Sequence, residues 1–163
     1  MNTSQIAAKM ILYSGGNLHD INHFMKVYAY AKTIGECERL DAQTQTALEA
    51  AALMHDIACP LCREKYGGAD GRHQETEGAI LARAFLEGSG CSAEFVERVI
   101  FLVGHHHTLT GIDGLDYQIL IEADYLVNAD EGKCSQANIR NTMARVFKTD
   151  TGISLLKSMY RLD

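Results

Sequence analysis

The residues of this 163-residue chain best suited to chemistry are histidines and aspartates set in otherwise apolar segments. The stretch AALMHDIACP, residues 51–60, is small and apolar until it reaches the adjoining pair His55 and Asp56. A buried carboxylate is rare unless it is paired or bound to a metal ion. The pair therefore indicates either a metal site or a helix C-terminal cap, in which the imidazole meets the last carbonyls.

Three further segments place similar residues among apolar neighbours. His23 lies in an apolar and aromatic stretch, residues 105–107 are three consecutive histidines, and Asp124 interrupts the segment ILIEADYLVN. Nitrogen and oxygen donors brought together from separate segments suit a divalent cation such as Mn, Fe, Ni, Co or Zn. Taken singly, a histidine such as His23 is more often a hydrogen-bonded core or surface residue, and Asp124 could simply pair with a lysine or arginine.

Helices must position these residues, because helical periodicity dominates the sequence and no segment shows convincing strand alternation. Asp20 and Asp41 are predicted N-caps, Pro60 is predicted to end the third helix, and residues 60–72 are expected to form a loop. The chain is thus predicted to be all-α, a single-domain helical bundle over residues 1–163. Eight helices are expected, over about residues 3–14, 20–34, 42–58, 75–87, 92–104, 115–129, 135–147 and 150–161.

Composition narrows the class of partner. Twenty-one acidic against fifteen basic side chains give a net charge of −6, which disfavours non-specific binding of nucleic acid. No apolar stretch approaches the roughly 20 residues that cross a bilayer, so no membrane partner is expected. The cysteines are odd in number, five, and the N-terminus lacks a charged start followed by an apolar stretch. Reduced thiols and a cytoplasmic location are therefore expected.

Two short motifs invite other interpretations. The pair Cys59 and Cys62 forms a C-x-x-C, but a zinc ribbon needs a second pair, and a thioredoxin-like site needs a preceding strand. The stretch HDINH, residues 19–23, has the spacing of an H-E-x-x-H metallopeptidase with Asp20 in place of the glutamate. That replacement shortens the base by a methylene, and a glycine-rich loop directly precedes it. Asp20 is therefore interpreted as an N-cap and His19 as exposed.

Three segments in a fixed order carry a family resemblance. HFMKVYAYAKTI contains His23, ALMHDIA contains His55 and Asp56, and ILIEADYLVN contains Asp124. Over residues 20–130 this pattern resembles the HD-domain phosphohydrolase superfamily. The resemblance implies a helical fold around a divalent cation (Mn, Fe, Ni, Co, Zn or Mg) that these four side chains ligate. It also implies hydrolysis of a phosphate ester or anhydride, commonly of a nucleotide, by metal-activated water, with Asp56 among the catalytic residues.

Relatives that bind two or three metal ions use further histidines. His106 falls eighteen residues before Asp124, as in relatives that hydrolyse dinucleoside polyphosphates, and His105 is its neighbour. An earlier histidine, four residues before a Gly-Ala pair, is replaced by Gln74, while His73 is one position off. A shift of one residue turns a helical side chain by about 100°. One ion is therefore expected in the resting protein, with a second site weak or absent and His105 and His106 as substrate-binding residues or partial ligands.

The acid–base group is less clearly indicated. Several relatives carry lysine or glutamate three residues after the aspartate of the pair, where this chain has Cys59. His105 or His106 is expected to stabilise the transition state or to protonate the leaving group. Lys65, Arg72 and His106 are the candidate substrate-binding residues. Other charged residues of the same region are candidates for acid–base or phosphate-binding roles, with a solvated charged loop as the alternative: Arg63, Glu64, Glu75 and Glu77.

The expected function is hydrolysis of a nucleotide or another small phosphorylated metabolite. An HD-type protein that binds or senses a nucleotide without turnover is the alternative, since Cys59 and Gln74 both depart from the family pattern. A dinuclear iron oxygenase would need the fuller ligand set. The helices expected over residues 135–162 pack on the motif-bearing core and are a candidate homodimer contact.

Overall fold

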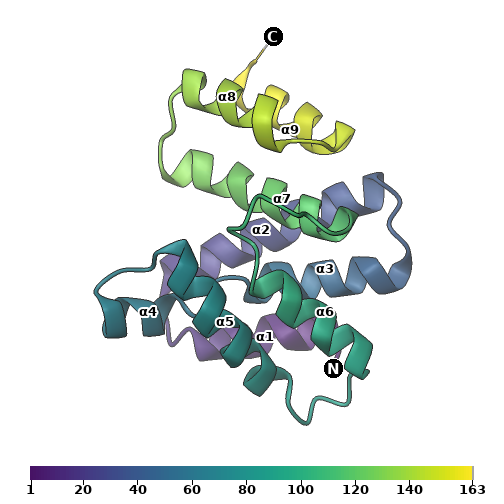
Figure 1. Cartoon of the computed structure of the whole chain (residues 1–163), viewed down its shortest axis with the longest axis vertical. Coiled ribbons are helices and arrows are strands. Elements are labelled where there is room, and N and C mark those ends of the chain that lie inside the picture. The colour runs from purple at the N-terminus through teal and green to yellow at the C-terminus, as the bar shows by residue number, and fades with distance from the viewer. Residues whose placement is uncertain (163) are drawn as a thin grey trace.

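The computed structural model describes residues 1–162, and in this range the chain consists of helices and connecting turns (Figure 1). This confirms the predicted all-α class. None of the helices in this range has the length and apolar character that crossing a bilayer requires. The helices are α1 (Thr3–Tyr13), α2 (Leu18–Cys37), α3 (Ala42–Met54), α4 (Cys59–Tyr66), α5 (Gly71–Leu86), α6 (Ala93–Val103), α7 (Leu115–Glu131), α8 (Gln136–Val146) and α9 (Asp150–Tyr160).

Short polar side chains cap α2, which carries His23, and α3, which leads to the pair His55 and Asp56. Asp41 accepts hydrogen bonds from the backbone N–H groups of Gln43 and Thr44, as an N-cap does, which confirms its predicted role. The prediction for Asp20 is wrong, because Asn17 is the N-cap of α2 and accepts from the N–H of Asp20. Asp20 instead lies in the first turn, where a carboxylate still interacts favourably with the helix dipole.

The third helix ends earlier than predicted. It stops at Met54, and residues 55–58 form a turn closed by hydrogen bonds from the N–H of Ile57 to Met54 and from the N–H of Cys59 to Asp56. Pro60 does not end this helix but lies in the first turn of α4, where its missing N–H has no intrahelical acceptor to lose. Residues 60–72 were expected to form a loop and instead contain α4 and the start of α5.

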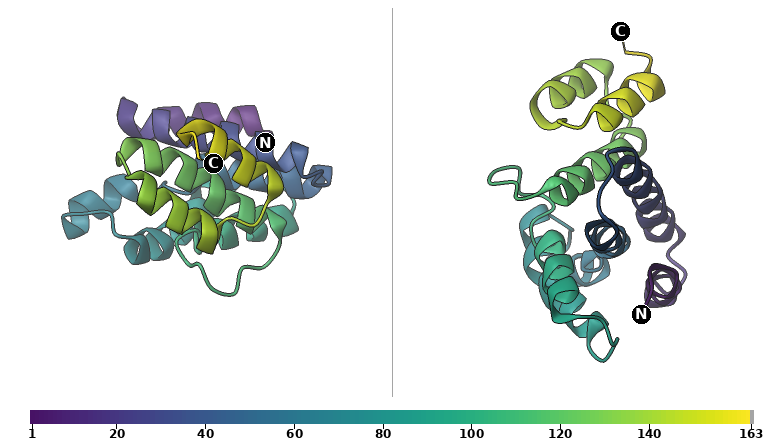
Figure 2. Two further views of the ribbon diagram at one scale, coloured as in Figure 1. Left: turned by 90° about the horizontal axis from the view of Figure 1, so that it is seen from above. Right: turned by 90° about the vertical axis from the view of Figure 1, so that its right-hand side faces the viewer.

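Helix α7 is the centre of the molecule. It is buried on almost every side, and it packs against α2, α3 and α9. Its polar residues Gln118, Glu122 and Asp124 are buried along with its apolar ones, so the segment lacks a clear polar stripe. Figure 1 shows α8 and α9 on one side of α7, and the side view in Figure 2 shows the earlier helices on the other.

A buried carboxylate ties the C-terminal helices to α7. Glu122 is fully buried and accepts hydrogen bonds from the backbone N–H groups of Lys148 (2.6 Å) and Thr149 (3.0 Å). The side chains of Gln118, at 2.7 Å, and Thr149 donate to it as well. Every donor lies in α7 or in the link between α8 and α9, so this one side chain fixes where the last two helices begin to pack.

Replacing Glu122 with alanine is expected to lower the free energy of unfolding by about 3 kcal/mol, since the N–H groups of Thr149, which is buried, and Lys148, which is partly so, each lose a charged acceptor. Urea unfolding followed by circular dichroism measures this change. Asp130→Ala is the matched control, because Asp130 is an exposed carboxylate on the same helix, and its loss should leave the free energy of unfolding within about 0.5 kcal/mol. An equal effect of the two substitutions would contradict the role given to Glu122.

Candidate metal centre

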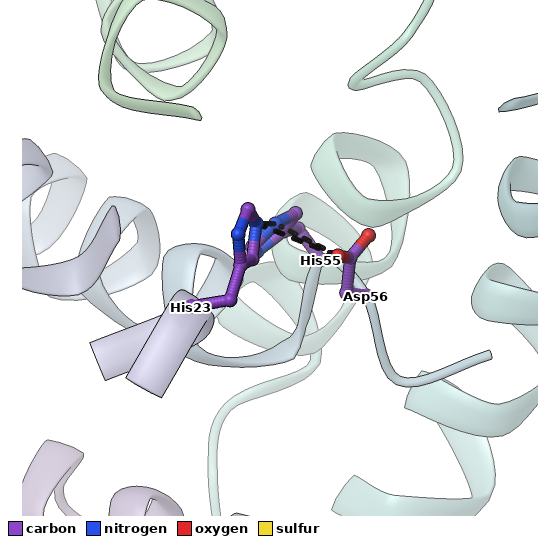
Figure 3. Close-up of side chains that lie close together, drawn as sticks. All are labelled: His23, His55 and Asp56. Carbon is purple, nitrogen blue, oxygen red and sulfur yellow. Dashed lines mark hydrogen bonds and ion pairs between the residues drawn. The ribbon is translucent and has the colours of Figure 1, made fainter. Parts of the chain in front are cut away.

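The four residues of the H…HD…D pattern come together from three parts of the chain. His23 lies on α2, His55 and Asp56 lie in the turn after α3, and Asp124 lies on α7. The Nε2 atom of His23 is 3.2 Å from Nε2 of His55, 3.2 Å from Oδ1 of Asp124 and 3.5 Å from Oδ2 of Asp56. Nε2 of His55 is 3.5 Å from Asp124 and 3.6 Å from Asp56. Figure 3 shows His23, His55 and Asp56 directed toward one another.

These spacings fit a shared cation. Two nitrogen or oxygen donors about 2.1 Å from one ion, at angles between 90° and 110°, lie about 3.0 to 3.4 Å apart. The separations that involve the Nε2 atom of His23 or of His55 are 3.2 to 3.6 Å. Donor atoms of His23, His55 and Asp56 all lie within 4.8 Å of one another, as a metal-holding group requires. Two imidazole nitrogens and two carboxylates so close together are therefore suited to bind a divalent ion.

Each imidazole of the centre is fixed through its other ring nitrogen. Nδ1 of His23 is 2.9 Å from Glu131, Nδ1 of His55 is 2.8 Å from the carbonyl of Ala52, and Nδ1 of His106 is 2.8 Å from the carbonyl of Val103. Those partners are acceptors, so the Nδ1 atoms donate, and in the neutral imidazole that binds a metal ion the lone pair lies on Nε2. This is the arrangement that orients metal-binding histidines.

His106 offers a second test of the fit. Its side chain is buried, and its Nε2 atom has no hydrogen-bond partner among residues 1–162. Burying a nitrogen without a hydrogen-bond partner costs free energy of folding, so the lack of a partner for this atom needs an explanation. The atom lies 3.6 Å from Oδ1 of Asp56, and Asp56, His106 and His107 form a second group whose donor atoms lie within 4.8 Å of one another. A cation on this side of Asp56 would satisfy the nitrogen.

The carboxylates and imidazoles of the cluster each favour the charged form of the other, which shifts their pKa values. Burial raises the pKa of Asp56, but the imidazoles of His55 and His106 outweigh that effect and hold it well below its usual range. Burial also raises the pKa of Asp124, and His23 and His55 lower it further than burial raises it. Burial lowers the pKa of His55, while Asp56 and then Asp124 raise it to about 9. The two carboxylates are therefore ionised and available to a cation.

Three residues predicted to act in catalysis or substrate binding lie elsewhere. Nδ1 of His105 contacts the carbonyl of Phe101 at 2.7 Å, and its ring stacks on that phenyl ring. His105 and Arg72 line a separate groove of about 560 Å³ between α5 and α6. Lys65 pairs with Glu77 at 2.7 Å on the surface. The structure thus brings His106 to the centre, and it does not bring His105, Arg72 or Lys65 there.

Gln74 occupies the position at which relatives with more metal ions have a further histidine. Gln74 is buried, and its Oε1 atom lies 3.4 Å from the thiol of Cys59 and 3.2 Å from Nε2 of His107. His73 does not reach this position, because it bonds to Asp70 at the start of α5 and stacks on a tyrosine ring. Burial, followed by the neighbouring His106, lowers the pKa of His107 to about 4, so this imidazole is neutral near pH 7.

Neither HDINH, residues 19–23, nor the pair Cys59 and Cys62 forms a metal site of its own among the described residues. His19 is exposed, and Asp20 pairs with Arg63 on α4, so HDINH presents only His23 to the cluster. Cys59 and Cys62 lie at the buried start of α4 as free thiols. Burial and the charge of Asp56 raise the pKa of the Cys59 thiol, which therefore stays protonated beside the centre.

Sequence reasoning missed the supporting roles of three residues of the centre. Glu131 lies seven residues after Asp124, on the same face of α7, and this spacing could have revealed it. His107 belongs to the histidine run, but its contact with Gln74 depends on the turn after α6. Glu75 accepts from the N–H of His107 at 3.0 Å and from the hydroxyl of Thr108 at 2.9 Å, which holds that turn in place.

Glu131→Ala is expected to weaken metal binding by about 10- to 100-fold, because His23 loses the carboxylate that orients it. Titration of metal-free protein with Mn²⁺ or Co²⁺ measures the dissociation constant. Glu131→Gln keeps an acceptor for Nδ1 and should recover most of the affinity, and Lys26→Ala removes a different partner of Glu131, 3.1 Å away, without touching His23. Unchanged affinity in Glu131→Ala would show that His23 needs no such support.

The fold and the centre together define a class: an all-helical protein that gathers a histidine, a His-Asp pair and a later aspartate around one cation-sized space. The chain belongs to the HD domain family, whose match covers residues 20–130. HD domains depend on a metal ion, and the group of His23, His55 and Asp56 is suited to hold one.

A solved structure agrees with this family. The chain is similar to a predicted HD superfamily hydrolase from an uncultured Thermotogales bacterium, known from a crystal structure at 1.45 Å. The two are 27% identical, with a TM-score of 0.67, and the match covers 98% of this chain and 83% of the other. No curated protein matches the chain.

Proposed function

We propose that this protein is a metal-dependent phosphohydrolase of the cytoplasm that cleaves a phosphate ester or anhydride of a nucleotide or another small phosphorylated metabolite. The observation that carries the proposal is the approach of Asp56 and Asp124 to the Nε2 atoms of His23 and His55, at 3.2 to 3.6 Å. Membership of the HD family and the similarity to a predicted hydrolase point to the same reaction class.

Each residue of the centre has a role in this proposal. His23, His55, Asp56 and Asp124 would hold the cation, and the two carboxylates would offset its charge. A divalent cation held there supplies water of lowered pKa and neutralises charge on phosphoryl oxygens. His106 lies beside Asp56 with its Nε2 atom free, and an imidazole so placed can donate to a phosphoryl oxygen or to the leaving group.

One observation favours a second function, the binding of a nucleotide without turnover. Relatives carry lysine or glutamate at the position of Cys59, and here that side chain is an uncharged, buried thiol. Lys65 and Glu77, two of the candidates for that role, pair with each other on the surface and do not take its place. His106 and His107 would then be the imidazoles near Asp56 that could assist the reaction from outside the ligand set.

A test for hydrolysis of phosphate compounds distinguishes the two functions. Metal-free protein is loaded with Mn²⁺, Co²⁺ or Ni²⁺ and offered p-nitrophenyl phosphate, bis-p-nitrophenyl phosphate and a panel of nucleotides. We expect turnover that depends on the added metal and stops with a chelator. Binding of a nucleotide to the loaded protein with no p-nitrophenol, phosphate or pyrophosphate released from any compound would instead support the sensing function.

A further inference from the structure

A cavity of about 350 Å³ adjoins the candidate metal centre. His106, His107 and Asp124 are among its lining residues, so a group bound at the centre would lie next to this cavity. Helix α7 forms the floor and α8 one side, while the segment after α6 contributes the remaining side. The cavity is therefore placed to hold whatever is attached to a phosphate bound at the centre.

The outer part of the cavity is apolar. Ile121 and Tyr125 contribute from α7, Val146 from α8 and Leu109 from the segment after α6. The Tyr125 hydroxyl lies 3.1 Å from Oδ1 of Asn138, and its ring packs edge-on against Phe147. An aromatic side chain held at both ends needs little ordering when a ligand binds, which favours affinity.

The polar groups of the outer cavity are few and uncharged. Asn128 offers an amide, which both donates and accepts, and Thr142 offers a hydroxyl with the same capacity. No lysine or arginine is among the lining residues, all of which belong to the described part of the chain. A second phosphate in this space would lose its hydration without gaining a cation, and that is unfavourable.

We propose that this cavity binds the uncharged ring system of a phosphate monoester, specifically the nucleoside of a nucleoside monophosphate. The proposal rests on the proposed function for the placement of the phosphate. Flat apolar rings suit the Tyr125 wall, and their edge donors and acceptors suit the amide of Asn128. The volume of about 350 Å³ is at the lower end of the range typical of ligand pockets. It admits one nucleoside and has no space for a second nucleoside.

The first experiment needs no turnover. The Mn²⁺-free protein is titrated with adenosine, guanosine, cytidine and uridine, and the methyl signals of Ile121, Thr142 and Val146 are followed by NMR. We expect at least one nucleoside to shift these signals. Thr142→Trp, which fills the cavity, should abolish the shifts of the Ile121 and Val146 signals, whereas Ala144→Trp adds the same side chain at an exposed position of α8 and should not. Asn128→Ala, an exposed position that changes no packing, should weaken the binding several-fold.

The second experiment compares substrates on the metal-loaded protein. We expect kcat/KM for the preferred nucleoside monophosphate to exceed that for ribose 5-phosphate, and that for the matching triphosphate, by at least tenfold. Thr142→Trp should reduce the ratio of monophosphate to ribose 5-phosphate at least tenfold, through KM, and Ala144→Trp should leave the ratio unchanged.

The outcomes separate the two proposals. Absence of turnover with any phosphate overturns the proposed function, while shifts of the three methyl signals still decide the cavity assignment. Nucleosides that shift no signal of the cavity, triphosphates or ribose 5-phosphate used as well as the monophosphate, or an unchanged ratio in Thr142→Trp would overturn the cavity assignment alone.

Discussion

Asp124→Ala is expected to strip the protein of bound metal and to abolish phosphate release. Asp124 contributes one of the two carboxylates of the centre, 3.2 Å from His23 and 3.5 Å from His55. Its pKa lies well below the usual range because the imidazoles of His23 and His55 outweigh the effect of burial, so the side chain carries a full negative charge. Loss of an ionised ligand should weaken binding more than loss of an orienting residue, by at least about a hundredfold.

Elemental analysis of the purified variant measures this effect as metal ions per chain, and phosphate release from the best substrate measures the activity. Asp130→Ala provides the control, since it removes a carboxylate from the same helix at an exposed position. The control should retain the metal content and activity of the parent protein. Full metal occupancy in Asp124→Ala would remove this aspartate from the site and with it the geometric basis of the proposed function.

His106→Asn is expected to leave the first metal ion in place and to reduce turnover by about 100-fold or more. The reason is that His106 lies outside the group of His23, His55 and Asp124, and its free Nε2 atom faces Asp56 at 3.6 Å. An asparagine amide can still donate to the carbonyl of Val103, as Nδ1 does, while it removes the inward nitrogen. The substitution therefore tests that one atom.

Metal binding and turnover are measured on the same preparation of this variant, by metal titration and by steady-state kinetics. His106→Gln extends a polar atom toward the place of Nε2 and should recover part of the turnover. His105→Asn is the neighbouring control, because the His105 ring lies against Phe101, and its loss should change kcat less than about threefold. A large loss in the His105 variant with none in the His106 variant would reverse the assignment of the two residues.

Much of the fold follows from local sequence. Asp41 and Ser92 each precede an apolar periodic segment and each caps a helix, because an N-cap satisfies backbone N–H groups only two or three residues away. The three ligand-bearing segments were recognised by their order and by the expense of burying their charged residues. Such signals are contained within about ten residues, so they can be read before the chain is folded.

The same local reasoning failed where two signals competed. Asn17 and Asp20 are both good N-caps, and the one that lies directly after the glycines starts α2. Pro60 marks a helix boundary, but it begins α4 instead of ending α3. The helix ends at Met54, and the turn that follows directs His55 and Asp56 toward α2 and α7.

By itself the sequence determined the helical class and the identity of residues 23, 55, 56 and 124 as candidate ligands. The tertiary structure decided which further histidine joins them. Within the run of residues 105–107, neighbouring side chains diverge in the turn after α6, so that His106 faces Asp56 while His105 packs on Phe101. It also decided that Glu131 supports His23, 108 positions away in the chain, and that α8 walls the adjoining cavity. These features depend on how distant helices pack, and packing is set by the whole core and by no single segment.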